Sequence, residues 1–117
     1  MLNCFGQSGI ERLKIPSNIV VIPNMFCGLC SNLKEVELSP NTMKIEESAF
    51  LGCSTLKEIA LPEKLMIIES LAFAQCFSLK KVVFPKKHIE IDKSAFSGCY
   101  TLTEIVNKPK ALNLKLE

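Results

Sequence analysis

Residues 45–62 read IEESAFLGCSTLKEIALP, and residues 91–105 repeat the pattern as IDKSAFSGCYTLTEI. The same pattern recurs through most of the chain: a leucine follows three residues after a cysteine, and successive copies are 23 residues apart. The positions are Cys30, Cys53, Cys76 and Cys99, followed by Leu33, Leu56, Leu79 and Leu102. Such a repeat predicts a stack of equivalent coils, because one short unit cannot bury its own apolar side chains.

Each unit contains two segments of alternating apolar residues, which is the pattern of short β-strands. The first segment, L-x-x-(I/V)-x-(L/F), contains Val36, Ile59, Val82 and Ile105. The second follows a proline and pairs Ile19 with Val21, Met43 with Ile45, Met66 with Ile68, and Ile89 with Ile91. An aromatic comes next, at Phe26, Phe50, Phe73 and Phe96. The Ala-Phe segment before a glycine predicts one short helical turn.

The repeat also predicts the domain organisation of the 117 residues, which is one domain. Four complete units cover residues 10–32, 33–55, 56–78 and 79–101. A partial repeat precedes them at residues 1–9, and a partial repeat with a C-terminal tail follows at residues 102–117. The alternating Leu112, Leu114 and Leu116 of that tail predict an added edge strand. Open apolar faces on a half-repeat predict end-to-end self-association or a piece of a longer array.

A period of about 20 to 29 residues rich in leucine and isoleucine is typical of leucine-rich repeats. We therefore expect an α/β leucine-rich-repeat solenoid, dominated by short parallel strands and completed by short helical or 3-10 turns. Residues 45–62 and 91–105 resemble the BspA-like, or Treponema-type, repeat, whose hallmark is I-x-x-x-A-F-x-x-C-x-x-L-x-x-I-x-L-P. The resemblance extends over nearly all of residues 10–106. It implies a right-handed solenoid of the kind found in secreted and surface proteins that adhere to host proteins and other cells.

The composition argues against catalysis and against binding of nucleic acid. The chain has one histidine (His88), one aspartate (Asp92), one tyrosine (Tyr100) and no tryptophan, so the usual acid-base groups are scarce. Its net charge is only +2. The basic cluster of Lys80, Lys81, Lys86, Lys87 and His88 includes one aromatic, Phe84, which takes an inward position of the repeat, so we interpret the cluster as a solvated face. We expect no enzyme activity, no cofactor and no nucleic-acid partner.

The sequence leaves the compartment open. The longest apolar runs, such as residues 19–22, are far too short to span a bilayer, and no signal peptide is visible. These features are typical of a soluble intracellular chain without membrane insertion. The resemblance to BspA-like proteins instead implies a secreted or cell-surface protein.

The cysteine column has two interpretations, a metal or redox site and a structural ladder. We favour the structural ladder, because buried cysteine behaves as a small apolar residue and the Cβ vectors of stacked neighbours run parallel. Cys27 and Cys30 form a single C-x-x-C, which is weak evidence for zinc without a second pair. We expect no metal site, and we expect Cys4 to be the most reactive thiol.

Binding is expected to use the outward positions of the first strand of each unit. These positions are Arg12, Lys14, Glu35, Glu37, Glu58, Ala60, Lys81, Val83, Glu104 and Val106. The strip formed by Ala60, Val83 and Val106 either binds a partner or is covered by the C-terminal tail, and we favour coverage by the tail. The leading hypothesis is a protein-interaction or adhesion module whose partner is a host or cell-surface protein. The alternative is a structural piece of a longer repeat protein with no partner of its own.

Overall fold

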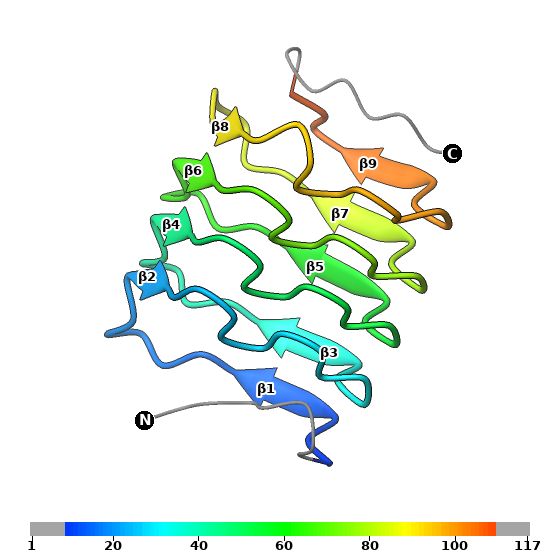
Figure 1. Ribbon diagram of the computed structural model, residues 1–117. Coiled ribbons are helices and arrows are strands. Elements are labelled where there is room, and N and C mark those ends of the chain that lie inside the picture. Colours follow the sequence, from blue (N-terminus) through cyan, green and yellow to red (C-terminus); the bar gives the residue numbers. More distant parts are fainter. Residues whose placement is uncertain (1–8, 110–117) are drawn as a thin grey trace.

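The computed structural model describes residues 9–109, which form successive coils built from short strands and turns (Figure 1). One strand of each coil joins a parallel sheet ordered β1-β3-β5-β7-β9. Its members are β1 (Arg12–Lys14), β3 (Glu35–Glu37), β5 (Glu58–Ala60), β7 (Lys81–Val83) and β9 (Glu104–Val106). A second parallel sheet, ordered β2-β4-β6-β8, lies on another side of the coils. It contains β2 (Val21–Ile22), β4 (Lys44–Ile45), β6 (Ile67–Ile68) and β8 (Glu90–Ile91).

The strand register follows the sequence period. Arg12 pairs with Glu35, Glu35 with Glu58, Glu58 with Lys81, and Lys81 with Glu104, so each step is 23 residues. A slip of one residue would turn every inward side chain outward, which explains why the spacing is kept so strictly. The predicted strand-dominated leucine-rich-repeat solenoid is therefore confirmed.

The core consists of columns of identical or similar side chains that lie above one another. The leucine column of Leu33, Leu56, Leu79 and Leu102 is fully buried. The rings of Phe50 and Phe73 are stacked with centroids 5.3 Å apart, and those of Phe73 and Phe96 with centroids 5.2 Å apart. Repetition thus turns the small apolar face of each coil into one continuous interior.

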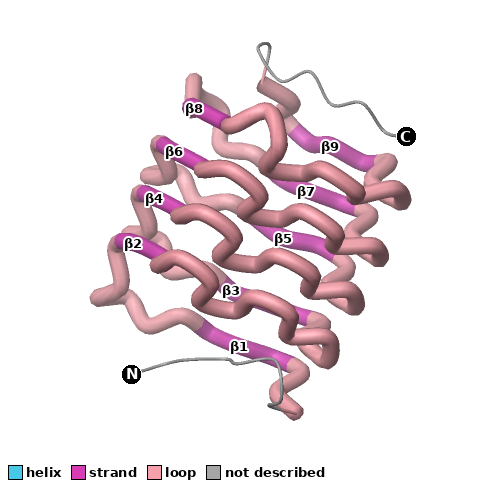
Figure 2. Tube along the Cα trace, in the orientation of Figure 1, coloured by secondary structure: helices cyan, strands magenta, loops and turns pink. Residues whose placement is uncertain are grey.

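The predicted helical turns are wrong, since residues 9–109 contain no helix (Figure 2). Ser48 and Gly52 have φ values of 59° and 72°, and a left-handed residue at every fourth position stops a right-handed helix. The N–H groups of Phe50 and Gly52 instead donate to the carbonyls of Ala72 and Ala74 in the next coil, both at 2.8 Å. The turns are therefore a third set of lateral contacts between coils.

The predicted alignment of the first coil is also wrong by one residue. Ile22, not Val21, pairs with Ile45 and is buried. The N–H of Cys27 donates to the Ala49 carbonyl at 2.6 Å, as Phe50 does to its own neighbour, so Cys27 occupies the phenylalanine column. Phe26 lies one position earlier and is half-buried. Lateral hydrogen bonding, rather than aromatic identity, sets the alignment.

Candidate protein-binding face

The ten predicted binding residues lie on the first sheet, at the two ends of each three-residue strand. The middle residue of each strand faces inward, and these residues are Leu13, Val36, Ile59, Val82 and Ile105. Seven of the ten predicted side chains are exposed, whereas Lys81, Val83 and Val106 are half-buried. Parallel pairing places the first residues of the five strands in one continuous column. In the second column, it pairs Lys14 with Glu37, and Val83 with both Ala60 and Val106. We call this surface the strand face.

The N-terminal half of the strand face is hollowed and carries three carboxylates and two basic groups. A hollow of about 490 Å³ is lined by Arg12, Lys14, Glu35, Glu37, Glu58 and Ala60, with Leu13 and Val36. Arg12 Nε lies 3.2 Å from a Glu35 carboxylate oxygen, and both side chains are largely exposed. Exposed ion pairs of this kind contribute little to folding, so a partner can replace them at small cost.

The centre of the strand face is held less tightly than its ends. The N–H of Lys57 lies 3.5 Å from the Lys34 carbonyl, whereas the equivalent bond from Lys80 to Lys57 is 2.8 Å. Glu35 and Glu58 are direct neighbours there, and like charges placed opposite each other on a sheet repel. The acidic neighbours therefore weaken the sheet locally, and positive charge from outside would relieve that repulsion.

The C-terminal half of the strand face is more apolar. Ala60 pairs with Val83, and Val83 with Val106, so the predicted strip is continuous. Lys81 Nζ lies 3.7 Å from a Glu104 carboxylate oxygen beside it. The C-terminal tail that was expected to cover this strip lies outside the described residues, as does Cys4.

Sequence reasoning missed an exposed aromatic pair on the turns. Phe77 and Tyr100 are stacked with ring centroids 6.0 Å apart, although 47% and 63% of their surfaces are exposed. Serines hold the same column in the two preceding coils, at Ser31 and Ser54. The change from serine to aromatic at a 23-residue interval was the signal that could have found the pair.

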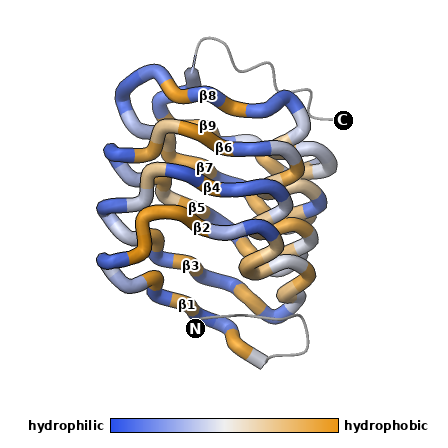
Figure 3. Tube along the Cα trace, turned by 60° about the vertical axis from the view of Figure 1, so that its left-hand side comes forward, coloured by the Kyte–Doolittle hydropathy of each residue, from blue (hydrophilic) through white to orange (hydrophobic). Residues whose placement is uncertain are grey.

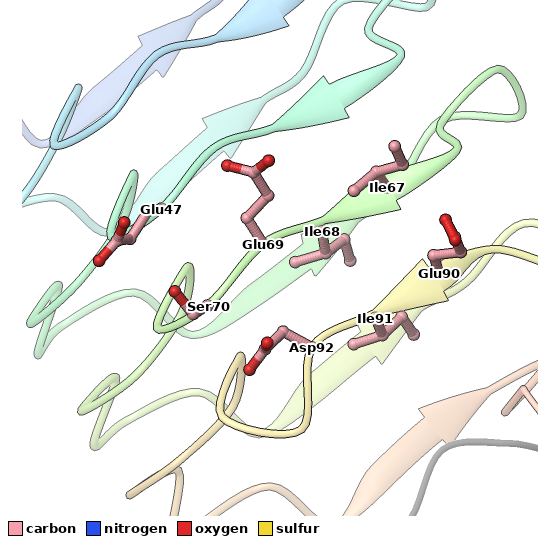
Figure 4. A pocket seen from close by; sticks show the side chains of 8 residues that line it. All are labelled: Glu47, Ile67, Ile68, Glu69, Ser70, Glu90, Ile91 and Asp92. Atoms are coloured by element: carbon pink, nitrogen blue, oxygen red, sulfur yellow. The ribbon is translucent and has the colours of Figure 1, made fainter.

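The second sheet carries a different surface, which changes character along the array. The hydrophobic stretch at β2 gives way to mainly hydrophilic residues around β8 (Figure 3). A hollow of about 520 Å³ there includes the acidic residues Glu47, Glu69, Glu90 and Asp92 among its lining. Their carboxylates are spread over successive coils and do not converge (Figure 4). Within residues 9–109, no three histidine, cysteine, aspartate or glutamate side chains are placed to hold a metal ion.

The cysteine column is buried as predicted, and its thiols donate hydrogen bonds. Cys53 Sγ lies 3.1 Å from the Cys27 carbonyl oxygen, and Cys99 Sγ lies 3.1 Å from the Phe73 carbonyl oxygen. Burial raises the pKa of Cys53 to about 12. Such a thiol is neutral at physiological pH and is a poor nucleophile or metal ligand. Cys30, at the head of the column, is disulfide-bonded.

Asp92 and His88, the single aspartate and the single histidine of the chain, lie on opposite sides of β8 in the sequence. Asp92 follows β8 in the column of Glu46 and Glu69, and it accepts hydrogen bonds from the N–H and hydroxyl of Ser94 at 2.9 and 2.7 Å. These bonds lower the pKa of Asp92 and order the turn. His88 lies exposed in the turn before β8, as expected for a solvated basic cluster. The part of the chain that the structure describes has no helix able to span a membrane.

The repeat fold with its two parallel sheets defines a leucine-rich-repeat protein. The family described as the BspA type leucine-rich repeat region matches residues 2–115 in six copies. The chain therefore belongs to this family. No curated protein matches it.

Three solved structures are similar to this chain. The leucine-rich repeat protein of T. pallidum has a TM-score of 0.81 and 27% identity, covering 92% of this chain and 61% of that one. A Bacteroides ovatus leucine-rich repeat protein has a TM-score of 0.78 and 30% identity, covering 86% of this chain and 26% of that one. A leucine-rich cell surface protein of Faecalibacterium prausnitzii has a TM-score of 0.69 and 28% identity, covering 83% of this chain and 32% of that one. The chain thus spans less than two thirds of each of these proteins.

Proposed function

We propose that this chain is a non-catalytic protein-recognition module of the adhesion type and that its partner docks on the strand face. The observation that carries the proposal is the ordered pair of outward columns over a hollow of about 490 Å³. Glu35, Glu37 and Glu58 present carboxylates at the centre of that face, where the sheet is held least tightly. Charge complementarity therefore favours a partner that carries lysine or arginine side chains.

The family relationship supports this function and a location at the cell surface. The F. prausnitzii protein of similar fold is described as a cell surface protein. Family membership also favours a scaffold over an enzyme, since repeat arrays build extended surfaces for binding. A protein of the host or of another cell is the class of partner that we propose.

Charge reversal on the strand face tests the proposal. We expect the chain with Glu35→Lys and Glu58→Lys to lose the proteins that the unaltered chain retains from extracts of surface-biotinylated cells. The matched control carries Glu47→Lys and Glu63→Lys, which change the net charge equally at exposed positions away from the strand face. Each retained protein is then purified, and its affinity for all three chains is measured by calorimetry. Equal affinity for both altered chains would refute docking on the strand face.

The alternative is a structural piece of a longer array, and it makes a different prediction. Such a chain binds no purified candidate and either stays monomeric or associates through its ends. Size-exclusion chromatography with light scattering, with and without reductant, distinguishes these states. A concentration-dependent oligomer that survives the Glu35→Lys and Glu58→Lys changes would favour end-to-end association over recognition by the strand face.

A further inference from the structure

A hollow of about 400 Å³ is formed by the turn before β8 and the segment after β9. Both segments lie at the C-terminal end of the array (Figure 1). It is lined by residues 85–88 and 107–109. We propose that this hollow binds a small organic anion, a molecule with a phosphate or carboxylate group on a compact apolar body. The site is separate from the strand face and does not depend on the function proposed above.

The charge of the lining is of one sign. Lys86, Lys87 and Lys108 contribute three ammonium groups, His88 adds an imidazole, and no carboxylate of residues 9–109 lines the hollow. None of these lysines forms an ion pair with another residue of the described part, although Lys34, Lys44 and Lys81 do. A concave surface lined by cations alone concentrates the positive potential and attracts anions.

The turn that supplies three of these groups differs from its equivalents in the earlier coils. There, a hydrogen bond of 3.1 Å closes the turn, for example from the Leu65 N–H to the Pro62 carbonyl. Side chains also link neighbouring coils, as Lys64 Nζ does with Asn41 Oδ1 at 3.1 Å. In the fourth coil Ile89 fills the core, and His88 at the position equivalent to Leu65 is exposed. This change places three consecutive basic residues on the outside of one turn.

The second wall of the hollow is anchored to the residue that precedes the first wall. Asn107 has a φ of 59°, and its Nδ2 donates to the Phe84 carbonyl at 3.1 Å, which fixes the second wall to the first. Pro85 and Pro109 restrict the backbone φ in each wall. A binding site that is already ordered loses less conformational entropy when a ligand binds.

The size and lining of the hollow define the class of ligand. A volume of about 400 Å³ falls in the range of small-molecule sites, which is roughly 300 to 1,000 Å³. The proline rings and the methylene stems of the lysines offer apolar contact, while the ammonium groups favour oxyanions. A bare inorganic ion would leave the apolar part of the lining without a partner.

Phenyl phosphate is a suitable probe, because it joins a phosphate to a compact ring. We expect a titration of the full chain, followed by ¹H–¹⁵N correlation spectra, to shift the amide resonances of residues 86–88 and 107–108. Lys86→Glu with Lys87→Glu should weaken binding at least about tenfold, since two charge-assisted contacts become repulsive. Lys108→Gln, on the opposite wall, should weaken binding without introducing a negative charge.

Three comparisons make the test decisive. Lys57→Glu with Lys93→Glu gives the same net charge at exposed positions outside the hollow, and we expect it to preserve binding. Equal weakening by this control pair, or resonance shifts spread over all lysines, would overturn the site. Benzyl alcohol should produce no comparable shifts, and equally strong shifts would overturn the requirement for an anion. Equal affinity for inorganic phosphate would overturn the requirement for an organic body.

Discussion

Thr42→Val should stabilise the fold, although it removes a polar group from a buried threonine. Thr42 is fully buried, and its Oγ1 is the one buried side-chain polar atom among residues 9–109 that lacks a hydrogen-bond partner. Its column is apolar in the neighbouring coils, with Ile19 before it and Leu65 after it. Valine has the same branched shape, so the change creates no cavity and only removes the unpaired hydroxyl.

The size of the effect follows from the cost of burying a hydroxyl without a partner, which is about 1–3 kcal/mol. The free energy of unfolding should rise by about that amount. With an m-value of about 1.5 kcal/mol per M, the urea midpoint should rise by about 0.7 M or more. Equilibrium unfolding followed by circular dichroism and by tyrosine fluorescence measures the midpoint and checks that the transition has two states.

Thr55→Val is the matched control, since it makes the same chemical change where the hydroxyl is used. Thr55 Oγ1 lies 2.8 Å from the Ser31 carbonyl oxygen and 2.9 Å from the Leu33 carbonyl oxygen. Its loss should lower the free energy of unfolding by about 0.5–1.5 kcal/mol. A lower midpoint for Thr42→Val, or shifts of the same sign in both variants, would refute the reasoning.

Three further changes test the core and the turns by urea unfolding. The pKa of Cys53 is about 12 in the folded chain, against an ordinary value of 9.0. Because the unfolded chain loses this proton first, each buried thiol of this kind should lower the free energy of unfolding by about 1.4 kcal/mol per pH unit between pH 9 and 12. Cys53→Ala should make this decrease with pH less steep. An unchanged slope would contradict the assignment. Gly52→Ala should lower the free energy of unfolding by at least about 1 kcal/mol, because φ is +72° and the new Cβ would lie 2.7 Å from Leu29 Cδ2. Gly9→Ala is the control and should have a smaller effect, since a Cβ at Gly9 meets no atom within 4 Å. Phe73→Leu should cost about 1–3 kcal/mol, since it removes both ring stacks, and a neutral result would refute their contribution.

The strands and the strand face could be predicted from the sequence because they depend on period alone. Once Cys30 and Cys53 are separated by 23 residues, Arg12 must lie beside Glu35 and point outward with it. Inward and outward positions then alternate as in any strand. No knowledge of the neighbouring coils is needed to place these side chains.

The turns could not be predicted in the same way, since their conformation is decided between coils. Ser48 adopts a positive φ while its N–H donates to the Ser70 carbonyl at 3.0 Å, 22 residues away in sequence. Local propensity favours a helical turn there and is overridden by that lateral bond. The same cause explains the first coil, where Phe26 was assigned by its identity although Cys27 holds the equivalent hydrogen bond.

The repeat itself separates residues that serve stacking from residues that are available for binding. Every coil must meet the same lateral demands, so inward positions such as Leu56 and Leu79 keep one residue type. Outward positions do not pack between coils, so their residue type can differ from one coil to the next, as from Glu58 to Lys81 on the strand face. The exposed aromatic pair and the basic hollow arise where such positions change, in the C-terminal half of the array. Specific recognition should therefore differ between the two ends of the array even though the scaffold beneath is uniform.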